Sequence, residues 1–216
     1  MHKEETLAKI REIGLIAVLR GPSPELTLKM VDALAAGGVL GIEITYTTPN
    51  APEVVKSLSS KYGDQIMLGM GTLTQSEHAQ QALDAGASFI VSPHGEAELA
   101  KAMVDTKLAV IIGALSPSEI VQARKWGADI VKVFPGSLGG SAYLKALRGP
   151  YPNIPIIPTG GVSIDNVADW FEAGAFAVGA GSTLCPSGFA IEGRFDDITE
   201  RARAFVMEVE RARSMK

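Results

Sequence analysis

Cysteine is nearly absent: Cys185 is the single one among 216 residues. An intrachain disulfide is therefore impossible, which fits a reducing compartment and predicts a cytoplasmic protein. The first residues, Met1–Glu5, lack the basic and then apolar layout of a signal peptide. No apolar run approaches the ~20 residues of a membrane span, so we expect no membrane partner.

Basic charge and histidine are also scarce. The 20 lysines and arginines are outnumbered by 24 acidic residues, giving a net charge of −4 that argues against a nucleic-acid partner. A small anionic substrate stays compatible, because a local site can be positive inside an acidic protein. The three histidines show no metal-site spacing with acidic residues, so we expect no bound metal.

What the sequence does contain is an alternation of short β-rich runs with segments of helical periodicity. Eight parallel strands joined by helices are expected from this alternation. An open, doubly wound sheet is the competing arrangement, but eight equal units without a linker favour a (β/α)8 TIM barrel, an α/β fold. We predict one domain over residues 1–216, with an extra N-terminal helix at 2–13. The predicted strands are Leu15–Arg20, Gly41–Tyr46, Met67–Leu73, Phe89–Ser92, Ala109–Leu115, Asp129–Phe134, Ile154–Thr159 and Phe176–Gly181.

Glycines precede several of these strands and mark where helices should end. Gly37, Gly86, Gly127 and Gly174 each follow a helical segment, where a left-handed residue commonly closes a helix. The stretch 186–196 is predicted to be a longer loop before the last helix.

Lys132 is the most informative polar residue at a predicted strand end. It lies in Ile130-Val-Lys-Val-Phe134, where alternation would turn Ile130, Lys132 and Phe134 towards the barrel interior. A strand lysine is commonly a snorkelling side chain, but both faces of a barrel strand are covered. Burial disfavours the charged ammonium, and a neutral amine can attack a ketone to form a Schiff base without any cofactor.

Glu43 should face the same interior. In Gly41-Ile-Glu-Ile-Thr45, alternation turns Ile42 and Ile44 towards the helices and Glu43 inward. It could be only a structural ion-pair partner of Lys132 or Arg20. Alternatively, a carboxyl group in a partly dry pocket can shuttle protons as a general acid and base.

Two glycine-rich loops follow the last two predicted strands. Thr159-Gly160-Gly161 ends the seventh strand, and Gly181-Ser182 ends the eighth. The loops after these strands commonly bind phosphate in this fold, because glycine lets backbone N–H groups approach an anion. Tight turns without a ligand are the alternative.

Arg20 and Thr72 leave two interpretations open. Arg20 ends the first strand and could hold a substrate carboxylate, or equally pair with Glu43 or solvent. Thr72, in Gly69-Met-Gly-Thr72, could bond substrate or only end its strand.

Taken together, these segments resemble the bacterial 2-keto-3-deoxy-6-phosphogluconate (KDPG) aldolase family. That family also includes 4-hydroxy-2-oxoglutarate and 2-keto-3-deoxy-6-phosphogalactonate aldolase activities. The resemblance runs from about Leu15 to Ser182. It rests on Ala17-Val-Leu-Arg20, Gly41-Ile-Glu-Ile-Thr45, Gly69-Met-Gly-Thr72, Ile90-Val-Ser-Pro93, Val131-Lys-Val-Phe-Pro135, Pro158-Thr-Gly-Gly161 and Gly181-Ser182.

The resemblance implies a class I aldolase that cleaves KDPG to pyruvate and glyceraldehyde 3-phosphate, and a homotrimer. Lys132 would form the Schiff base and Glu43 would be the acid and base. Thr72 and Thr159 would contact the pyruvate half, with Pro93 and Phe134 lining the pocket. The phosphate would lie against Gly160, Gly161, Gly181 and Ser182.

One position departs from the family pattern. Many members have arginine where this chain has Thr47, in Glu43-Ile-Thr-Tyr-Thr47, so Arg20 could supply the missing positive charge. Two other hypotheses keep the fold. One is a sugar-phosphate isomerase or epimerase with Glu43 as base, and the other is a non-catalytic barrel that binds a phosphorylated metabolite or acts as an assembly scaffold.

Overall fold

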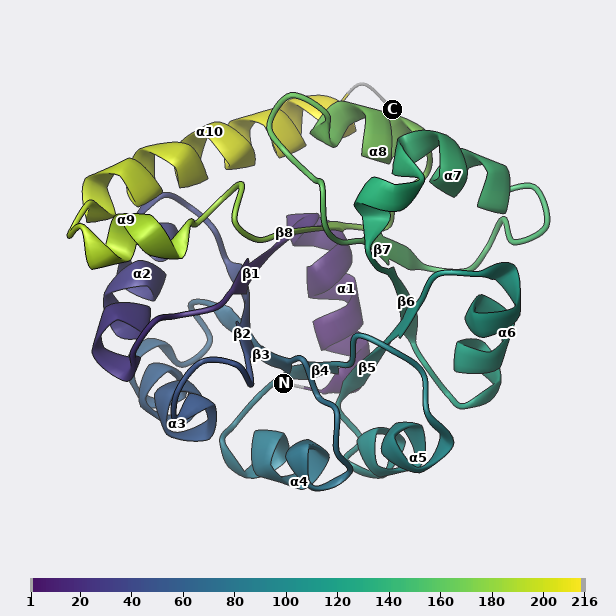
Figure 1. Ribbon diagram of the computed structural model, residues 1–216, viewed down its shortest axis with the longest axis horizontal. Helices are drawn as coiled ribbons and strands as arrows, with labels where there is room; N and C mark the ends of the chain where they lie inside the picture. Colours follow the sequence, from purple (N-terminus) through teal and green to yellow (C-terminus); the bar gives the residue numbers. More distant parts are fainter. Residues whose placement is uncertain (1, 215–216) are drawn as a thin grey trace.

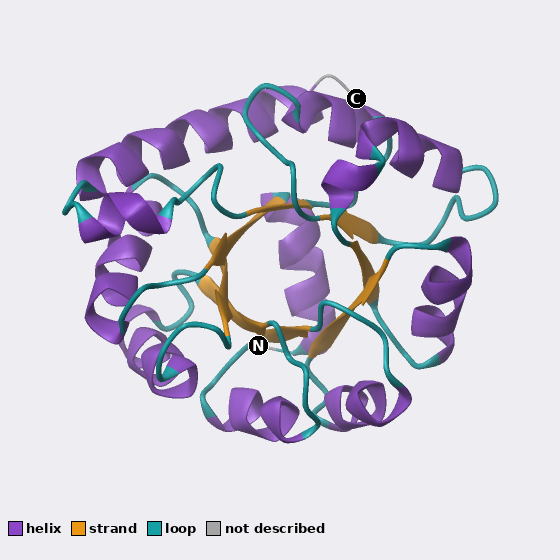
Figure 2. Ribbon diagram, viewed as in Figure 1, coloured by secondary structure: helices purple, strands orange, loops and turns teal. Residues whose placement is uncertain are grey.

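The computed structural model describes residues 2–214, which form an eight-stranded parallel barrel surrounded by helices (Figures 1 and 2). The strands pair in the order β7-β6-β5-β4-β3-β2-β1-β8. A parallel bridge between Thr159 and Gly179 joins the two ends of this order, so the barrel is nearly closed. The predicted (β/α)8 fold is confirmed.

The first five strands begin where the sequence predicts, the last three begin one or two residues later, and all eight end earlier than predicted. Arg20 and Phe134, predicted as the last residues of their strands, lie just beyond them and belong to the loops at the carboxyl end of the barrel. The strands are β1 (Leu15–Leu19), β2 (Gly41–Thr45), β3 (Met67–Gly71), β4 (Phe89–Val91), β5 (Ala109–Ala114), β6 (Ile130–Val133), β7 (Ile156–Pro158) and β8 (Val178–Ala180).

Helices follow the strands and form the outer layer, and none of those in residues 2–214 is long and apolar enough to cross a membrane. The outer helices are α2 (Pro24–Ala36), α3 (Ala51–Tyr62), α4 (Glu77–Asp84), α5 (Ala97–Asp105), α6 (Pro117–Lys125), α7 (Gly140–Leu147), α8 (Val167–Glu172), α9 (Ser187–Ile191) and α10 (Phe195–Ser214), with a 3-10 turn, η1, at Gly136–Leu138.

The extra N-terminal helix, α1 (Lys3–Ile13), lies across the amino end of the barrel (Figure 1). Its Ile10 is fully buried among side chains that fill the lower part of the barrel interior. Phe89, Ile111 and Ile130 belong to this apolar layer. The lower interior is therefore packed, and polar interior residues are confined to the carboxyl end of the strands.

Two local predictions need correction. Gly86, Gly127 and Gly174 have the expected positive φ, but Gly37 does not, and Gly38 has a φ of +88° instead. Gly37 allows α10 to pack closely against the end of α2, because a Cβ at position 37 would lie 2.4 Å from Ala202 Cβ on α10. The stretch 186–196 was predicted as a loop but contains α9 and the start of α10, where Ala190 is buried against the core.

Candidate active site

Lys132 and Glu43 face one another inside the barrel, as alternation along their strands predicts. Lys132 is 5% exposed and Glu43 3%, while Val131 and Ile42 beside them pack outward into the helical layer. Lys132 Nζ lies 3.6 Å from Glu43 Oε1, which is an ion-pair distance but too long for a hydrogen bond. Glu43 Oε1 is buried without a hydrogen-bond partner in the described chain, so this oxygen is available to a reacting group.

Gly71 makes room for the Glu43 carboxyl group. It ends β3 and pairs in register with Thr45 on β2. A Cβ at position 71 would lie 1.9 Å from Glu43 Oε1, well inside contact distance. Gly71 is therefore a spatial requirement of the acidic side chain as well as part of a sequence motif, whereas Gly69 makes room for the Phe89 ring.

Arg20 is held by a directed chain of hydrogen bonds. Its Nε donates to Thr47 Oγ1 at 2.9 Å, and the Thr47 and Thr45 hydroxyl oxygens are 2.8 Å apart. Thr45 Oγ1 in turn donates to the Leu19 carbonyl oxygen at 3.2 Å. Because Thr45 uses its hydrogen on Leu19, Thr47 must donate to Thr45 and accept from Arg20. The terminal nitrogens of Arg20 make no hydrogen bond to the residues that the structure describes, so they can bind an anion.

A cavity of about 320 Å³ opens above this layer at the carboxyl end of the strands. It brings together seven of the predicted site residues, and Arg20 is the one charged side chain in its described lining. These seven are Arg20, Phe134, Thr159, Gly160, Gly161, Gly181 and Ser182.

The two predicted phosphate loops are tied to each other across this cavity. Thr183 Oγ1 donates to the Val162 carbonyl oxygen at 2.5 Å, linking the loop after β8 to the loop after β7. Asn166 accepts from Ser163 N and donates to the Gly161 carbonyl oxygen, which fixes the first loop. The sequence did not predict these roles of Thr183 and Asn166, since neither residue lies in a glycine-rich motif.

Pro93 lines a smaller adjoining cavity of about 160 Å³, and Phe134 borders both spaces. Phe134 is 40% exposed, and its ring centroid lies 5.5 Å from Lys132 Nζ. Gly113 allows the close approach of the Pro93 segment, because a Cβ there would lie 2.1 Å from the Pro93 carbonyl oxygen.

Three predicted site residues do not line either cavity: Lys132 and Glu43, which are buried beneath this end of the barrel, and Thr72. The φ of Thr72 is +60°, which is unusual for a β-branched residue, and such strain is found preferentially at functional sites.

His78 fixes the segment that follows Thr72. The backbone N–H of Thr74 donates to His78 Nδ1 at 3.3 Å, and the His78 ring stacks on the Tyr46 ring with 3.9 Å between the ring centroids. Burial lowers the pKa of His78, which favours the neutral, accepting imidazole.

Cys185 is buried, as expected of a small apolar residue. Burial raises the pKa of its thiol to about 12, so it is a poor nucleophile despite bordering the larger cavity. Within residues 2–214, Lys132 and Glu43 are the buried amine and carboxyl group that face one another at this end of the barrel.

A buried lysine beside a carboxyl group, at the carboxyl end of a (β/α)8 barrel, is the arrangement that a lyase of the Schiff-base aldolase class requires. The family model of KDPG and KHG aldolases matches residues 6–201. The chain belongs to that family.

The sequences of individual relatives align with nearly the whole chain. A 2-dehydro-3-deoxy-phosphogluconate aldolase of Pseudomonas aeruginosa is 34% identical over 209 residues, which cover 94% of each chain. A 2-dehydro-3-deoxy-6-phosphogalactonate aldolase of Escherichia coli is 32% identical, over 90% of this chain and 94% of the relative.

One solved structure shows related chemistry. The KDPG aldolase of Legionella pneumophila, with pyruvate captured at low pH as a covalent carbinolamine intermediate, superposes with a TM-score of 0.84. It is 29% identical, and the match covers 92% of this chain and 97% of the Legionella chain.

Proposed function

We propose that this protein cleaves KDPG to pyruvate and glyceraldehyde 3-phosphate through a Schiff base on Lys132. The observation that carries the proposal is the buried pair formed by Lys132 Nζ and Glu43 Oε1, 3.6 Å apart. An isomerase would need only a base, and a passive binding barrel would need neither group. The pair instead supplies an amine nucleophile and a proton carrier within reach of one substrate.

The reaction begins when the neutral Lys132 amine adds to the C2 carbonyl of the keto acid. Loss of water leaves a protonated imine. Glu43 then takes the proton of the C4 hydroxyl group, directly or through water, and the C3–C4 bond breaks. Its electron pair moves into the iminium to give an enamine, and glyceraldehyde 3-phosphate leaves.

The second half returns the enzyme to its starting state. The protonated Glu43 gives its proton to C3 of the enamine, which regenerates the iminium. Water adds to C2 and hydrolysis releases pyruvate and the free Lys132 amine. No metal or organic cofactor takes part in this scheme, because the iminium is itself the electron sink.

Substrate binding uses the cavity above this pair. Arg20 supplies the positive charge for the keto-acid carboxylate, since Thr47 occupies the position where many relatives have arginine. Gly160, Gly161, Gly181 and Ser182 surround the phosphate, and Thr159 lies between the phosphate loops and the barrel interior. Phe134, Pro93 and Thr72 border the pyruvate half.

A substrate panel tests the assignment. Release of pyruvate should show the highest kcat/KM for KDPG, with the galactonate epimer and 4-hydroxy-2-oxoglutarate cleaved more slowly. The galactonate epimer is the second candidate, because the E. coli galactonate relative is nearly as similar as the P. aeruginosa gluconate relative. A higher kcat/KM for the epimer would transfer the assignment to it, and failure on all three would refute it.

A matched pair of lysine variants tests whether the measured activity comes from this protein or from a contaminating enzyme. Lys132→Met should lose activity towards every member of the panel, while Lys145→Met, at an exposed position on α7, should retain it. Activity of Lys132→Met equal to that of Lys145→Met would show that the measured cleavage does not use this site.

The assembly and location belong to the same proposal. We expect residues 1–216 to act as one domain, in a homotrimer and in the cytoplasm. The family resemblance supports the trimer, and the lone cysteine supports a reducing compartment. Light scattering should give three times the mass of the chain.

A further inference from the structure

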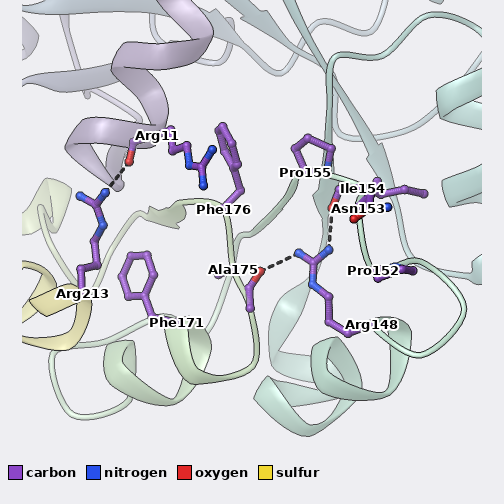
Figure 3. A pocket seen from close by; sticks show the side chains of 11 residues that line it. Arg11, Arg148, Pro152, Asn153, Ile154, Pro155, Phe171, Ala175, Phe176 and Arg213 are labelled. Carbon is purple, nitrogen blue, oxygen red and sulfur yellow. Dashed lines mark hydrogen bonds between the residues drawn. The ribbon is translucent and has the colours of Figure 1, made fainter. Parts of the chain in front are cut away.

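A second hollow lies at the amino end of the barrel, opposite the catalytic cavity. It has a volume of about 640 Å³, twice that of the cavity that Arg20 lines. Arg11, Arg148 and Arg213 line it together with Asn153, Phe171 and Phe176 (Figure 3). Its described lining holds no acidic residue, which is unusual for three arginines in a protein of net charge −4.

Arg148 enters this hollow from the end of α7. Its Nη1 donates to the Ile154 carbonyl oxygen and its Nη2 to that of Gly174, both at 2.6 Å. Nε is buried without a partner within residues 2–214. Gly174 leaves the space for this side chain, because a Cβ there would lie 3.0 Å from Nε. Burial lowers the pKa of Arg148, so its charge is incompletely compensated by the protein.

Arg213 and Arg11 lie together on the other side of the hollow (Figure 3). Arg213 comes from α10 and donates to the backbone carbonyl oxygens of Arg11 and Glu12. The Arg11 guanidinium lies 6.0 Å from the Phe176 ring centroid and makes no hydrogen bond in the described structure. All N–H groups of the Arg11 guanidinium are therefore unused within residues 2–214 and can donate to a ligand.

The protein neutralises the positive charges of Arg11, Arg148 and Arg213 only in part. No carboxylate of the described residues comes within ion-pair distance of these three guanidinium groups. They lie near the ends of α1, α7 and α10, where each helix dipole contributes roughly half a negative charge. Three such ends offset about half of three positive charges, which leaves the hollow positive.

We propose that this hollow is a binding site for a phosphate group, separate from the catalytic cavity. Arg11 supplies the bidentate contact that arginine makes with phosphate oxygens, and the second N–H of Arg148 Nη2 approaches from the opposite side, since both Nη1 hydrogens are bound to the Ile154 and Tyr151 carbonyl oxygens. Phe176 offers apolar surface to the carbon part of a phosphate monoester. The ligand is thus a small phosphate-bearing molecule or free phosphate.

Amide chemical shifts can observe both ends of the barrel in one titration. The intact protein is titrated at constant ionic strength with inorganic phosphate, and in a second arm with glycerol 3-phosphate. Ala175 and Phe176 report on the hollow, and Gly161 reports on the catalytic cavity. We expect saturable shifts at Ala175 and Phe176, with tighter binding of glycerol 3-phosphate if Phe176 contacts its carbon atoms.

Arg11→Gln is the decisive variant, because the Arg11 side chain makes no hydrogen bond within the described residues, and its backbone carbonyl oxygen, which accepts from Arg213, is unchanged by the substitution. It should weaken phosphate binding at Ala175 and Phe176 about tenfold and leave Gly161 unaffected. The matched control is Arg203→Gln, which removes the same charge from an exposed position about 15 Å along α10. Absent shifts at Ala175 and Phe176, or equal affinity in Arg11→Gln and wild type, would overturn the proposal.

Discussion

Arg20 donates from Nε to the hydroxyl group of Thr47 at 2.9 Å, and this contact orients the one charged side chain that, among residues 2–214, lines the cavity at the carboxyl end of the barrel. Arg20 directly follows β1, and Thr47 lies in the loop after β2. The hydroxyl group of Thr47 therefore holds a positive charge at the carboxyl end of the barrel.

Removal of this charge should weaken substrate binding. Arg20→Gln loses charge-assisted hydrogen bonds to the substrate carboxylate, so we expect KM to rise about 10- to 100-fold. The effect on kcat should be smaller, because Lys132 and Glu43 are untouched. Steady-state kinetics with KDPG measure both, and an unchanged KM would show that Arg20 does not bind the substrate.

The hydrogen bond between Arg20 and Thr47 can be tested by substitutions at position 47. Thr47→Val keeps the shape but loses the hydroxyl group, and we expect KM to rise about two- to tenfold. Thr47→Ser keeps the hydroxyl group and should behave like wild type. Equal KM values for the two variants would show that the Arg20–Thr47 contact has no role in binding.

Gly71→Ala should disturb the acid without unfolding the barrel. The added Cβ would lie 1.9 Å from Glu43 Oε1, so the carboxyl group must move away from its position beside Lys132. We expect kcat to fall at least about tenfold, since small displacements of a reacting group carry large costs. Gly188→Ala is the control, because a Cβ there meets nothing within 4 Å. Equal kcat in the two variants would contradict this role of Gly71.

Glu43→Gln removes the proton carrier and keeps its volume. General acid and base catalysis contributes roughly 10²–10⁴-fold, so kcat should fall by that factor. Lys132 remains, and pyruvate should still be trapped on it by borohydride, which separates loss of proton transfer from loss of the fold. A kcat within tenfold of wild type would assign Glu43 to a structural ion pair.

Cys185 should be unreactive in the folded protein. Burial raises its thiol pKa from 9.0 to about 12, so at pH 8 about one thousandth as much thiolate forms as in the unfolded chain. A chromogenic disulfide reagent should therefore label native protein at least about a thousandfold more slowly than denatured protein. Comparable rates would show that the thiol is accessible in the fold.

The barrel and its inward-facing pair could be predicted from sequence because both depend on local patterns. Alternation along β2 and β6 settles which way Glu43 and Lys132 point, and the order of parallel strands then brings them to one end. Strand ends were less predictable. Arg20 and Phe134 directly follow the last residues of β1 and β6, and the local sequence does not mark these two positions as loop residues.

Contacts between distant segments could not be predicted in this way. The Arg20–Thr47 bond joins residues 27 positions apart, and its geometry depends on how the loops after β1 and β2 leave the sheet. Gly37 was assigned a left-handed conformation because local sequence does not reveal that α10 packs against it. The arginine hollow combines α1, α7 and α10, which share no motif.

Borohydride trapping with pyruvate tests the central claim most directly. The protein is reduced in the presence of pyruvate, digested, and analysed by mass spectrometry for a lysine that has gained a reduced pyruvyl group. The mechanism predicts one modified lysine, Lys132, with turnover lost in proportion to its modification. An adduct on a different lysine, or full activity after reduction with pyruvate, would contradict it.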